Sequence, residues 1–326
     1  MRIPVEDLRT LSSAILQHHG LNEVDARIVA DAILEAELRG RPAYGVVRLP
    51  GIAERAASHG RTPMRVVRRG GAGTLVDGKG NLGYLVAHRC ARTASEKARQ
   101  GGGIGLVGAF NTDACGMAGY YVSLVVSTGL ICLMMCNGSP RTVPWGATEP
   151  VLGANPLAAG FPFSGGQVLV DLSTSATTQG DLLMALRTGE RIPEGRAVDH
   201  EGRLTTDPQA ALKGAALPFG GHKGFALGLV VQVLASALVG AAPIPKPGEN
   251  YGLLMLALDP AIFVDREVFD RGLSEIVRRV KSARRAEAGT EILIPGERAF
   301  RDRERRLKEG VEVDADLLEE LQKLLR

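Results

Sequence analysis

The chain has 326 residues, of which 45% are hydrophobic and 23% charged, and its formal net charge is +3 at pH 7. This composition is typical of a globular protein of one or two domains. The basic residues are mixed with acidic ones, and this distribution of charge argues against binding to nucleic acid or to an acidic membrane surface. The first residues lack the apolar core of a signal peptide, so we expect a cytoplasmic protein.

The first sixty residues are predicted to be helical. Residues 4–39 carry apolar side chains at helical spacing in two blocks, which Gly20 separates as the cap of the first helix. Asn22 is of the residue type that caps a second helix, with Asp25 in its first turn. A third helix is expected over residues 49–57.

The rest of the chain alternates between strands and helices. Strands are predicted within 60–81 and over 103–110, 130–137, 167–174 and 252–260. Helices are predicted over 82–100, 116–129, 176–189, 221–241 and 265–285, with two more after residue 296. This alternation indicates an α/β core with a helical N- and C-terminal periphery.

Three glycines, Gly103, Gly105 and Gly108, match the G-x-G-x-x-G pattern of dinucleotide-binding loops. Such a loop should follow a strand and open a helix. Here the glycines precede and enter an apolar strand instead. We therefore expect a tight turn and close packing at this position rather than a phosphate-binding loop.

The cysteines and histidines show no pattern of a metal site. The cysteines are Cys90, Cys115, Cys132 and Cys136, without a C-x-x-C pair, and we expect them to be buried, reduced thiols. The six histidines lack metal-ligand spacing, so no metal is predicted. The longest apolar run lies within residues 225–245 and is interrupted by Gly and Gln, which favours a buried core helix over a membrane span.

Two polar segments have the composition of ligand-binding loops. In "FGGHKG", His222 and Lys223 lie among glycines directly before the long apolar helix. Amides at a helix N-terminus and a cation favour an anion such as phosphate, although the same loop can start a helix with a solvated lysine. In "VDLSTSATTQGD", Asp171 and several hydroxyls lie at a strand end, where they can bind a ligand or cap a helix.

Several segments, taken in order, resemble the malate/L-lactate dehydrogenase family of non-Rossmann oxidoreductases. They are "ADAILEAELRG", "YGVVRLP", "VPWGATEPVLGANPLA", "VLVDLSTSATTQGD", "IPEGRAVDHEGRLTTDPQAALKGAALPFGGHKGF" and "ILIPGERAFRDR". The resemblance implies a mixed β-sheet, a homodimer, NAD or NADP as cofactor, and hydride exchange with a small 2-oxo acid, 2-hydroxy acid or cyclic imine carboxylate. It divides the chain into a helical peripheral and dimerisation domain (1–70 with 285–326) and an α/β core that binds cofactor and substrate (71–284).

Matching positions carry the family's binding roles over to this sequence. The residues that would lie on the cofactor are Gly138, Asp171, Leu172, Ser173 and Lys223, together with the adjacent His222. Arg48 matches the arginine that grips the substrate carboxylate. A guanidinium suits that task because it offers two parallel charged hydrogen bonds.

Two departures from the family pattern concern the proton donor. The family motif Ser-His-Gly reads Ala43, Tyr44 and Gly45 here, and the family's second active-site histidine corresponds to Ala114, which we place in the substrate-binding set. Reduction of a ketone leaves an alkoxide that must be protonated, and alanine cannot supply the proton. Tyr44 and Asp113 are the candidate catalytic residues, and ordinary packing or solvation is the alternative for each.

Three interpretations remain open from the sequence. The first is an active oxidoreductase with an altered substrate, for which an iminium ion that brings its own proton would reduce the need for an acid. The second is a non-catalytic relative that binds a nucleotide or another small ligand. The third is a recruited enzyme in which Tyr44, Asp113 or Cys115 carries different chemistry.

Overall fold

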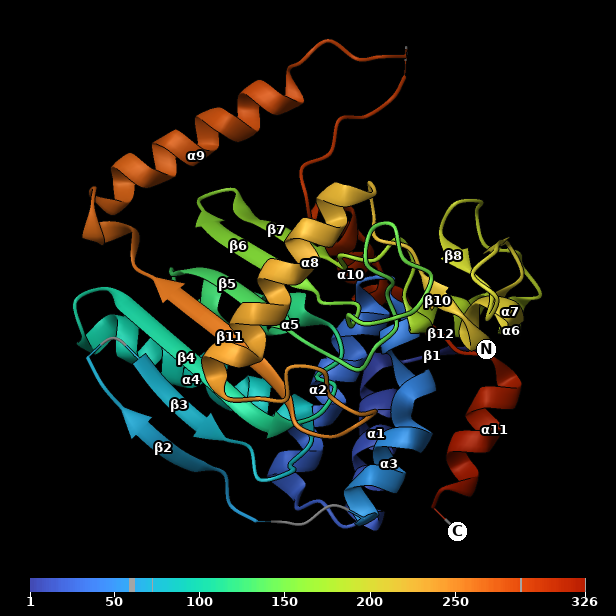
Figure 1. The fold of residues 1–326 in the computed structure, drawn as a ribbon. Coiled ribbons are helices and arrows are strands. Elements are labelled where there is room, and N and C mark those ends of the chain that lie inside the picture. Colours follow the sequence, from blue (N-terminus) through green and yellow to red (C-terminus); the bar gives the residue numbers. More distant parts are fainter. Residues whose placement is uncertain (59–61, 72, 288, 326) are drawn as a thin grey trace.

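A mixed β-sheet forms the centre of the molecule (Figure 1). The structure is a computed structural model and describes residues 1–58, 62–71, 73–287 and 289–325. Within these residues the sheet has seven strands, in the spatial order β2 (Arg65–Arg69), β3 (Gly73–Asp77), β4 (Ile104–Thr112), β11 (Tyr251–Leu258), β5 (Ile131–Cys136), β6 (Leu157–Phe163) and β7 (Gly166–Leu172). Only β3 and β4 pair in parallel. The predicted α/β fold with a mixed sheet is confirmed.

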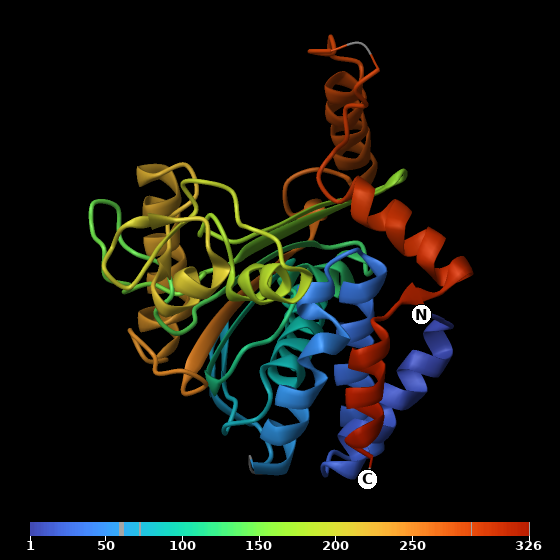
Figure 2. The ribbon, with the colours of Figure 1, turned by 90° about the vertical axis from the view of Figure 1, so that its right-hand side faces the viewer.

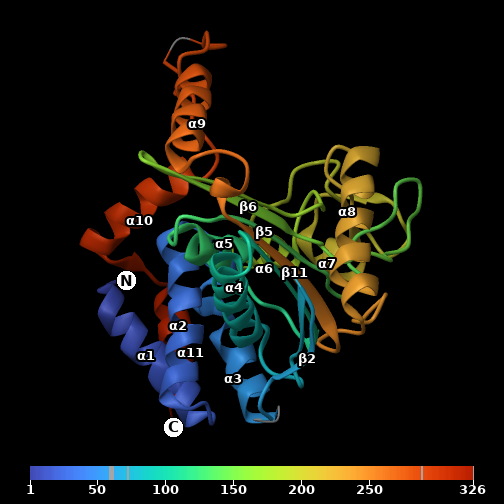
Figure 3. The same cartoon turned by 90° about the vertical axis from the view of Figure 1, so that its left-hand side faces the viewer.

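Helices cover both faces of this sheet (Figures 1 and 3). The helices α4 (Gly83–Gln100) and α5 (Ala118–Val126) pack on one face, and α8 (His222–Ala235) packs on the other. A Cβ atom on Gly105 of β4 would lie 1.9 Å from the carbonyl oxygen of Ala94 in α4. The glycine is therefore required for the close approach of helix and strand, as the sequence predicted for this motif.

Five further helices gather beside α4 and α5 (Figure 2). They are α1 (Val5–His18), α2 (Glu23–Leu38), α3 (Leu49–Ser58), α10 (Glu297–Glu309) and α11 (Ala315–Lys323). The predicted cap of α2 is present, since the side chain of Asn22 accepts a hydrogen bond of 2.9 Å from the Asp25 amide. The N-terminal strand β1 (Arg2–Ile3) pairs with β12 (Val311–Glu312), which precedes the last helix α11. The division into a peripheral domain and a core stays a prediction.

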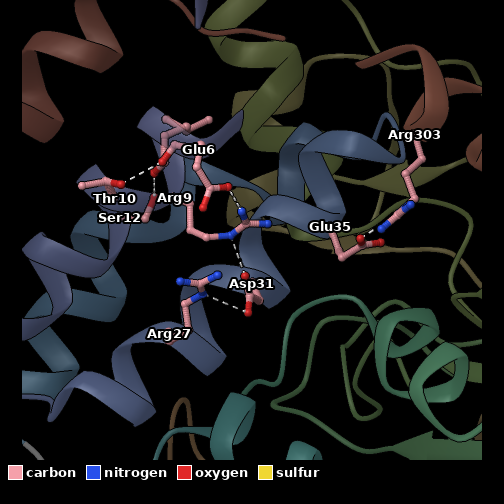
Figure 4. A network of polar contacts seen from close by, with 9 residues as sticks. Glu6, Arg9, Thr10, Ser12, Arg27, Asp31, Glu35 and Arg303 are labelled. Carbon is pink, nitrogen blue, oxygen red and sulfur yellow. Dashed lines mark hydrogen bonds and ion pairs between the residues drawn. The ribbon is translucent and has the colours of Figure 1, made fainter. Parts of the chain in front are cut away.

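Ion pairs fasten the C-terminal helix α10 and the N-terminal helix α1 onto α2 (Figure 4). The Arg9 guanidinium lies 2.8 Å from the Asp31 carboxylate, and the Arg303 guanidinium lies 2.8 Å from Glu35. Glu35 also pairs with Arg39 at 2.8 Å, and both of these side chains are largely buried. The end of α2 is thus held from several sides, and the loop that follows it starts from a fixed point.

Short elements and two helices complete the fold outside the main sheet. They are α6 (Gln179–Thr188), α7 (Pro208–Lys213), β8 (Ala197–Val198), β9 (Leu204–Thr205), β10 (Ala215–Ala216) and α9 (Arg266–Lys281). Helix α9 has no buried residue and projects away from the body of the molecule (Figures 1 and 2). In the described ranges, His222–Val239 is the one helical stretch long and apolar enough to cross a membrane, and 39% of it is buried against the protein.

Most predicted elements are present, with several differences. Strands β1 and β6, helix α7 and the small sheet of β8, β9 and β10 were not predicted, and α8 ends at Ala235 rather than near residue 241. Residues 60, 61 and 72 of the predicted strand segment lie outside the described residues. The prediction for the cysteines is confirmed, because all four are free thiols and buried.

Candidate active site

A cavity of about 670 Å³ opens at one edge of the sheet. The pairings make β4, β5 and β7 run in the same direction, since an antiparallel strand separates each of them from the next. Their carboxyl ends therefore meet at one edge, the usual position of ligand sites in α/β folds. The segments that follow these three strands, 113–118, 136–141 and 171–178, all line the cavity.

The loop of residues 42–48 brings two predicted site residues into this cavity. Tyr44 and Arg48 both line it, from two successive 3-10 turns that follow α2. The loop is fixed underneath by the buried Glu37, whose carboxylate accepts a hydrogen bond of 2.8 Å from the Val46 amide. A Cβ on Gly45 would lie 1.8 Å from that carboxylate. Glycine is required there because the loop passes so close to Glu37.

Burial of Glu37 has an electrostatic consequence. Desolvation raises the pKa of its carboxyl group to about 7, although the Val46 amide and the Arg306 guanidinium act in the opposite direction. The Glu37 carboxyl group, which supports the loop, therefore changes its protonation state near neutral pH.

The Tyr44 phenol remains protonated in this environment. Burial raises the pKa of Tyr44 above its usual value of 10, while a hydrogen bond with the Thr178 side chain and the charge of Arg48 lower it by less. A phenol that keeps its proton at neutral pH can act as a hydrogen-bond donor toward a ligand. The raised pKa makes proton release harder, so the phenol can donate a hydrogen bond but is a weaker acid than a free tyrosine.

Arg48 lines the same cavity as Tyr44, and within the described residues its terminal nitrogens form no ion pair. Its Nε donates a hydrogen bond of 2.8 Å to the carbonyl oxygen of Ala43, which orients the guanidinium. A Cβ on Gly180, at the start of α6, would lie 3.0 Å from an Nη atom of Arg48. The absence of a side chain at Gly180 therefore leaves space for the Arg48 fork.

Asp113 and Ala114 follow the end of β4 and also line the cavity. One oxygen of Asp113 accepts a hydrogen bond of 2.5 Å from Arg55, and the other accepts one of 2.5 Å from the Gly83 amide at the start of α4. The carboxylate is buried and engaged at both oxygens. Ala114 is exposed to the cavity and leaves space where a larger side chain would stand.

Four predicted cofactor residues come together at the ends of β5 and β7. Gly138, Asp171, Leu172 and Ser173 all line the cavity. Asp171 accepts a hydrogen bond of 2.8 Å from the Gly119 amide, and burial raises the pKa of its carboxyl group despite that bond and the nearby arginines. Ser173 lies 2.6 Å from the hydroxyl of Ser175, so the hydroxyls predicted at this strand end form one cluster.

His222 and Lys223 lie at the N-terminus of α8, outside the cavity lining. Both are exposed, and His222 makes an edge contact with Trp145 at a centroid distance of 6.4 Å. The preceding loop is attached to the β7 end, because the Phe219 amide donates to the Thr174 carbonyl at 3.1 Å. The two residues therefore belong to the rim beside the strand-end cluster.

Arg141 and Asn155 are among the polar residues of the lining that sequence reasoning missed. The Nε atom of Arg141 and the Oδ1 atom of Asn155 are buried, and neither has a hydrogen-bond partner within the described residues. The amide orientation of Asn155 is fixed, since its Nδ2 donates to the Gly228 carbonyl at 2.9 Å and to Gln232 at 2.8 Å. Asn155 lies in the Gly/Pro-rich segment "VPWGATEPVLGANPLA", which indicates a loop that lines a cleft, but the lack of a partner at either residue is a property of the tertiary structure.

A sequence model described as malate/L-lactate dehydrogenase matches residues 3–322, nearly the whole chain. The chain belongs to the malate/L-lactate dehydrogenase family. It is therefore an oxidoreductase, a dehydrogenase or reductase, as the resemblance predicted. Across the described ranges, no group of three His, Cys, Asp or Glu side chains is arranged to hold a metal ion.

Individual members of the malate/L-lactate dehydrogenase family align over their full length. The L-sulfolactate dehydrogenase of Methanothermobacter thermautotrophicus is 38% identical, covering 98% of this chain and 95% of that protein. The Delta(1)-pyrroline-2-carboxylate/Delta(1)-piperideine-2-carboxylate reductase of Pseudomonas putida is 33% identical, covering 100% and 97%. The solved structure of the sulfolactate dehydrogenase of Methanocaldococcus jannaschii superposes with a TM-score of 0.90 at 34% identity, covering 99% and 96%.

Proposed function

We propose that this protein transfers a hydride between NAD or NADP and a small 2-oxo acid or a cyclic imine carboxylate, or in reverse from the 2-hydroxy acid. The observation that carries the proposal is the cavity in which the 42–48 loop and the ends of β5 and β7 meet. One loop supplies a carboxylate-binding arginine and a proton-bearing phenol, and the strand ends supply the predicted cofactor residues.

The lining suits a nicotinamide group. The unpaired, fully buried Oδ1 of Asn155 is a hydrogen-bond acceptor that a carboxamide N–H would satisfy. Gly138, Asp171, Leu172 and Ser173 would hold the cofactor in the cavity, and Lys223 with His222 at the α8 N-terminus would face its phosphates. When bound, the cofactor supplies or accepts the hydride.

Arg48 binds the substrate carboxylate in this proposal. With Nε bound to the Ala43 carbonyl, its two Nη groups can donate to a carboxylate. The hydrogen bond and the space over Gly180 fix the position of the fork before the substrate arrives. Binding then orients the substrate without a costly reorganisation of the arginine.

Tyr44 donates the proton to the substrate oxygen. Ketone reduction places negative charge on that oxygen, and the Tyr44 phenol is the protonated group on the same loop as Arg48. Asp113 stays a candidate from the sequence, but its oxygens accept from Arg55 and Gly83, so we assign the donation to Tyr44. An iminium substrate brings its own proton, and the exposed Ala114 leaves space for its ring.

Oxidation of NADH and NADPH tests this function against a panel of 2-oxo acids, with and without amines, and of cyclic imines. We expect turnover with at least one class and its loss in Arg48→Met. Arg92→Gln, which changes an exposed arginine on α4, serves as the matched control. Cofactor binding by fluorescence without turnover on any substrate would contradict the proposal and favour a non-catalytic ligand-binding protein.

We further propose that a second copy of the chain covers α8 and α9, which completes a homodimer in the cytoplasm. The exposed apolar side chains on and beside these helices are Leu229, Val230, Val233, Leu238, Phe263, Val268, Ile276 and Val280. Most apolar residues of α1 and α2 are instead buried in the core, with Val24 as an exposed exception. These exposed residues favour an interface on α8 and α9 over the predicted one on residues 1–70 with 285–326.

A further inference from the structure

Arg141 is a cation in the lining of the cavity. Its side chain lines the cavity and is half-buried, and its Nε atom is fully buried without a hydrogen-bond partner. In the described part of the chain it forms no ion pair. Arg55 in the same lining is paired with Asp113, and the buried Arg39 is paired with Glu35. Arg141 therefore differs from the arginines that have a structural role.

The backbone of Arg141 holds it in a fixed place. Its amide donates a hydrogen bond of 2.8 Å to the Leu152 carbonyl, and its carbonyl accepts one of 2.8 Å from the Ala216 amide. The neighbouring Thr142 forms bridges to the same two positions. Because three segments of chain meet there, the side chain starts from a rigid base. A buried donor on such a base is costly unless a ligand supplies an acceptor.

The charges of the lining also favour an anionic ligand with more than one acid group. The charged residues of the lining are Arg41, Arg48, Arg55 and Arg141, with Asp113, Asp171 and Asp181. The pairing of Arg55 with Asp113 leaves three arginines against two aspartates. Asp181 is also engaged at the N-terminus of α6, where it accepts from the Thr178 amide at 2.9 Å.

We propose that Arg141 binds a second acid group of the substrate, a carboxylate or sulfonate on C3, while Arg48 binds the carboxylate on C1. This inference rests on the proposed function and makes Arg141 the residue that selects dianionic over monoanionic 2-oxo acids. An oxyanion of the cofactor is the other possible source of the same chemistry. We assign the substrate because the α8 N-terminus with Lys223 already offers a cation and free amides that suit the cofactor phosphates, whereas Arg141 lies in the lining with Arg48.

The selectivity of Arg141→Gln tests the assignment. We would measure kcat/KM for oxaloacetate and 3-sulfopyruvate against pyruvate and 2-oxobutanoate, with NADH and with NADPH. The ratio of dianion to monoanion should fall about 10- to 100-fold, as expected for loss of a hydrogen-bonded charge pair. Cofactor KM values should not change, Arg141→Lys should recover part of the ratio, and Arg92→Gln should behave as the wild type.

Three results would overturn the inference. The first is that Arg141→Gln loses kcat/KM equally for dianionic and monoanionic acids. The second is that Arg141→Gln keeps the wild-type ratio but has a raised KM for NADH or NADPH. The third is that the wild-type enzyme prefers pyruvate to the dianionic acids. The second result would assign Arg141 to a cofactor phosphate.

A binding measurement does not depend on turnover. By calorimetry, Arg141→Gln should weaken malate about 10- to 100-fold and leave lactate unchanged, and an equal effect on both would also refute the assignment. If the wild type reduces none of the acids, the proposed function fails, yet this comparison still tests Arg141. If Arg141→Gln does not melt cooperatively, Arg141→Lys is measured in its place, with a partial loss of preference expected.

Discussion

Replacement of Glu37 by Gln should change how stability depends on pH. Glu37 is buried under the 42–48 loop, and desolvation raises the pKa of its carboxyl group from 4.5 to about 7. Because the pKa is raised in the folded state, the contribution of Glu37 to stability is fully present below pH 4.5 and is lost as the pH rises to about 7. The shift corresponds to about 3 kcal/mol of unfolding free energy lost by the wild type above pH 7. Glutamine avoids this loss and keeps an oxygen for the Val46 amide.

Thermal or urea unfolding at pH 5 and pH 8 measures the effect. The difference in stability between Glu37→Gln and wild type should grow by about 2.5 kcal/mol from the lower to the higher pH, about 3 to 4 °C in Tm for a chain of this length. Glu23→Gln, at the exposed first turn of the same helix, is the control and should show no such change. Parallel pH dependences of Glu37→Gln and wild type would show that the Glu37 carboxyl is not perturbed, and the reasoning would fail.

Three further predictions concern the loop and the proposed interface. Tyr44→Phe should lower kcat for 2-oxo acids about 100-fold or more, because a general acid is lost, and should leave kcat for cyclic imines unchanged in the same NADPH assay. Equal losses for both substrate classes would contradict proton donation by Tyr44. Gly45→Ala places a methyl group 1.8 Å from the Glu37 carboxylate, so the loop must move; substrate KM should rise and denaturation should show a loss of about 1–3 kcal/mol, and unchanged values would refute the tight fit. Ile276→Asp on α9 should convert a dimer to a monomer in light scattering, and an unchanged mass would exclude α9 from the interface.

Sequence reasoning reached the fold because local patterns and tertiary packing agree in most elements. Strand β6 was missed because Pro156 precedes it and Gly160 and Pro162 lie within it, residues that usually mark loops. The structure shows their reason: a Cβ on Gly160 would lie 2.6 Å from side chains of α5, and Pro162 pairs near the hairpin end with Gln167. Strand β6 is therefore stabilised by packing against α5, and its own residues do not indicate a strand.

Residues of the site could be predicted from the sequence only where they match the family motifs. The expected residues of the 42–48 loop and of the β7 end do lie around one cavity, while Lys223 lies outside its lining. Position relative to a cavity depends on how distant segments pack, as for Lys223 on α8. The partnerless atoms of Arg141 and Asn155 depend on the same packing, so no local pattern could reveal them.

The arrangement separates the proposed chemistry from the proposed selectivity. Tyr44 and Arg48 lie four positions apart on one loop, and Glu37 fixes that loop through the Val46 amide. The distance between proton donor and carboxylate site is thus set by a short piece of backbone, whatever group the substrate carries on C3. Arg141 comes from a different segment with its own backbone anchors. A change at position 141 can therefore alter which acid is bound without moving the proposed proton donor or the carboxylate-binding arginine.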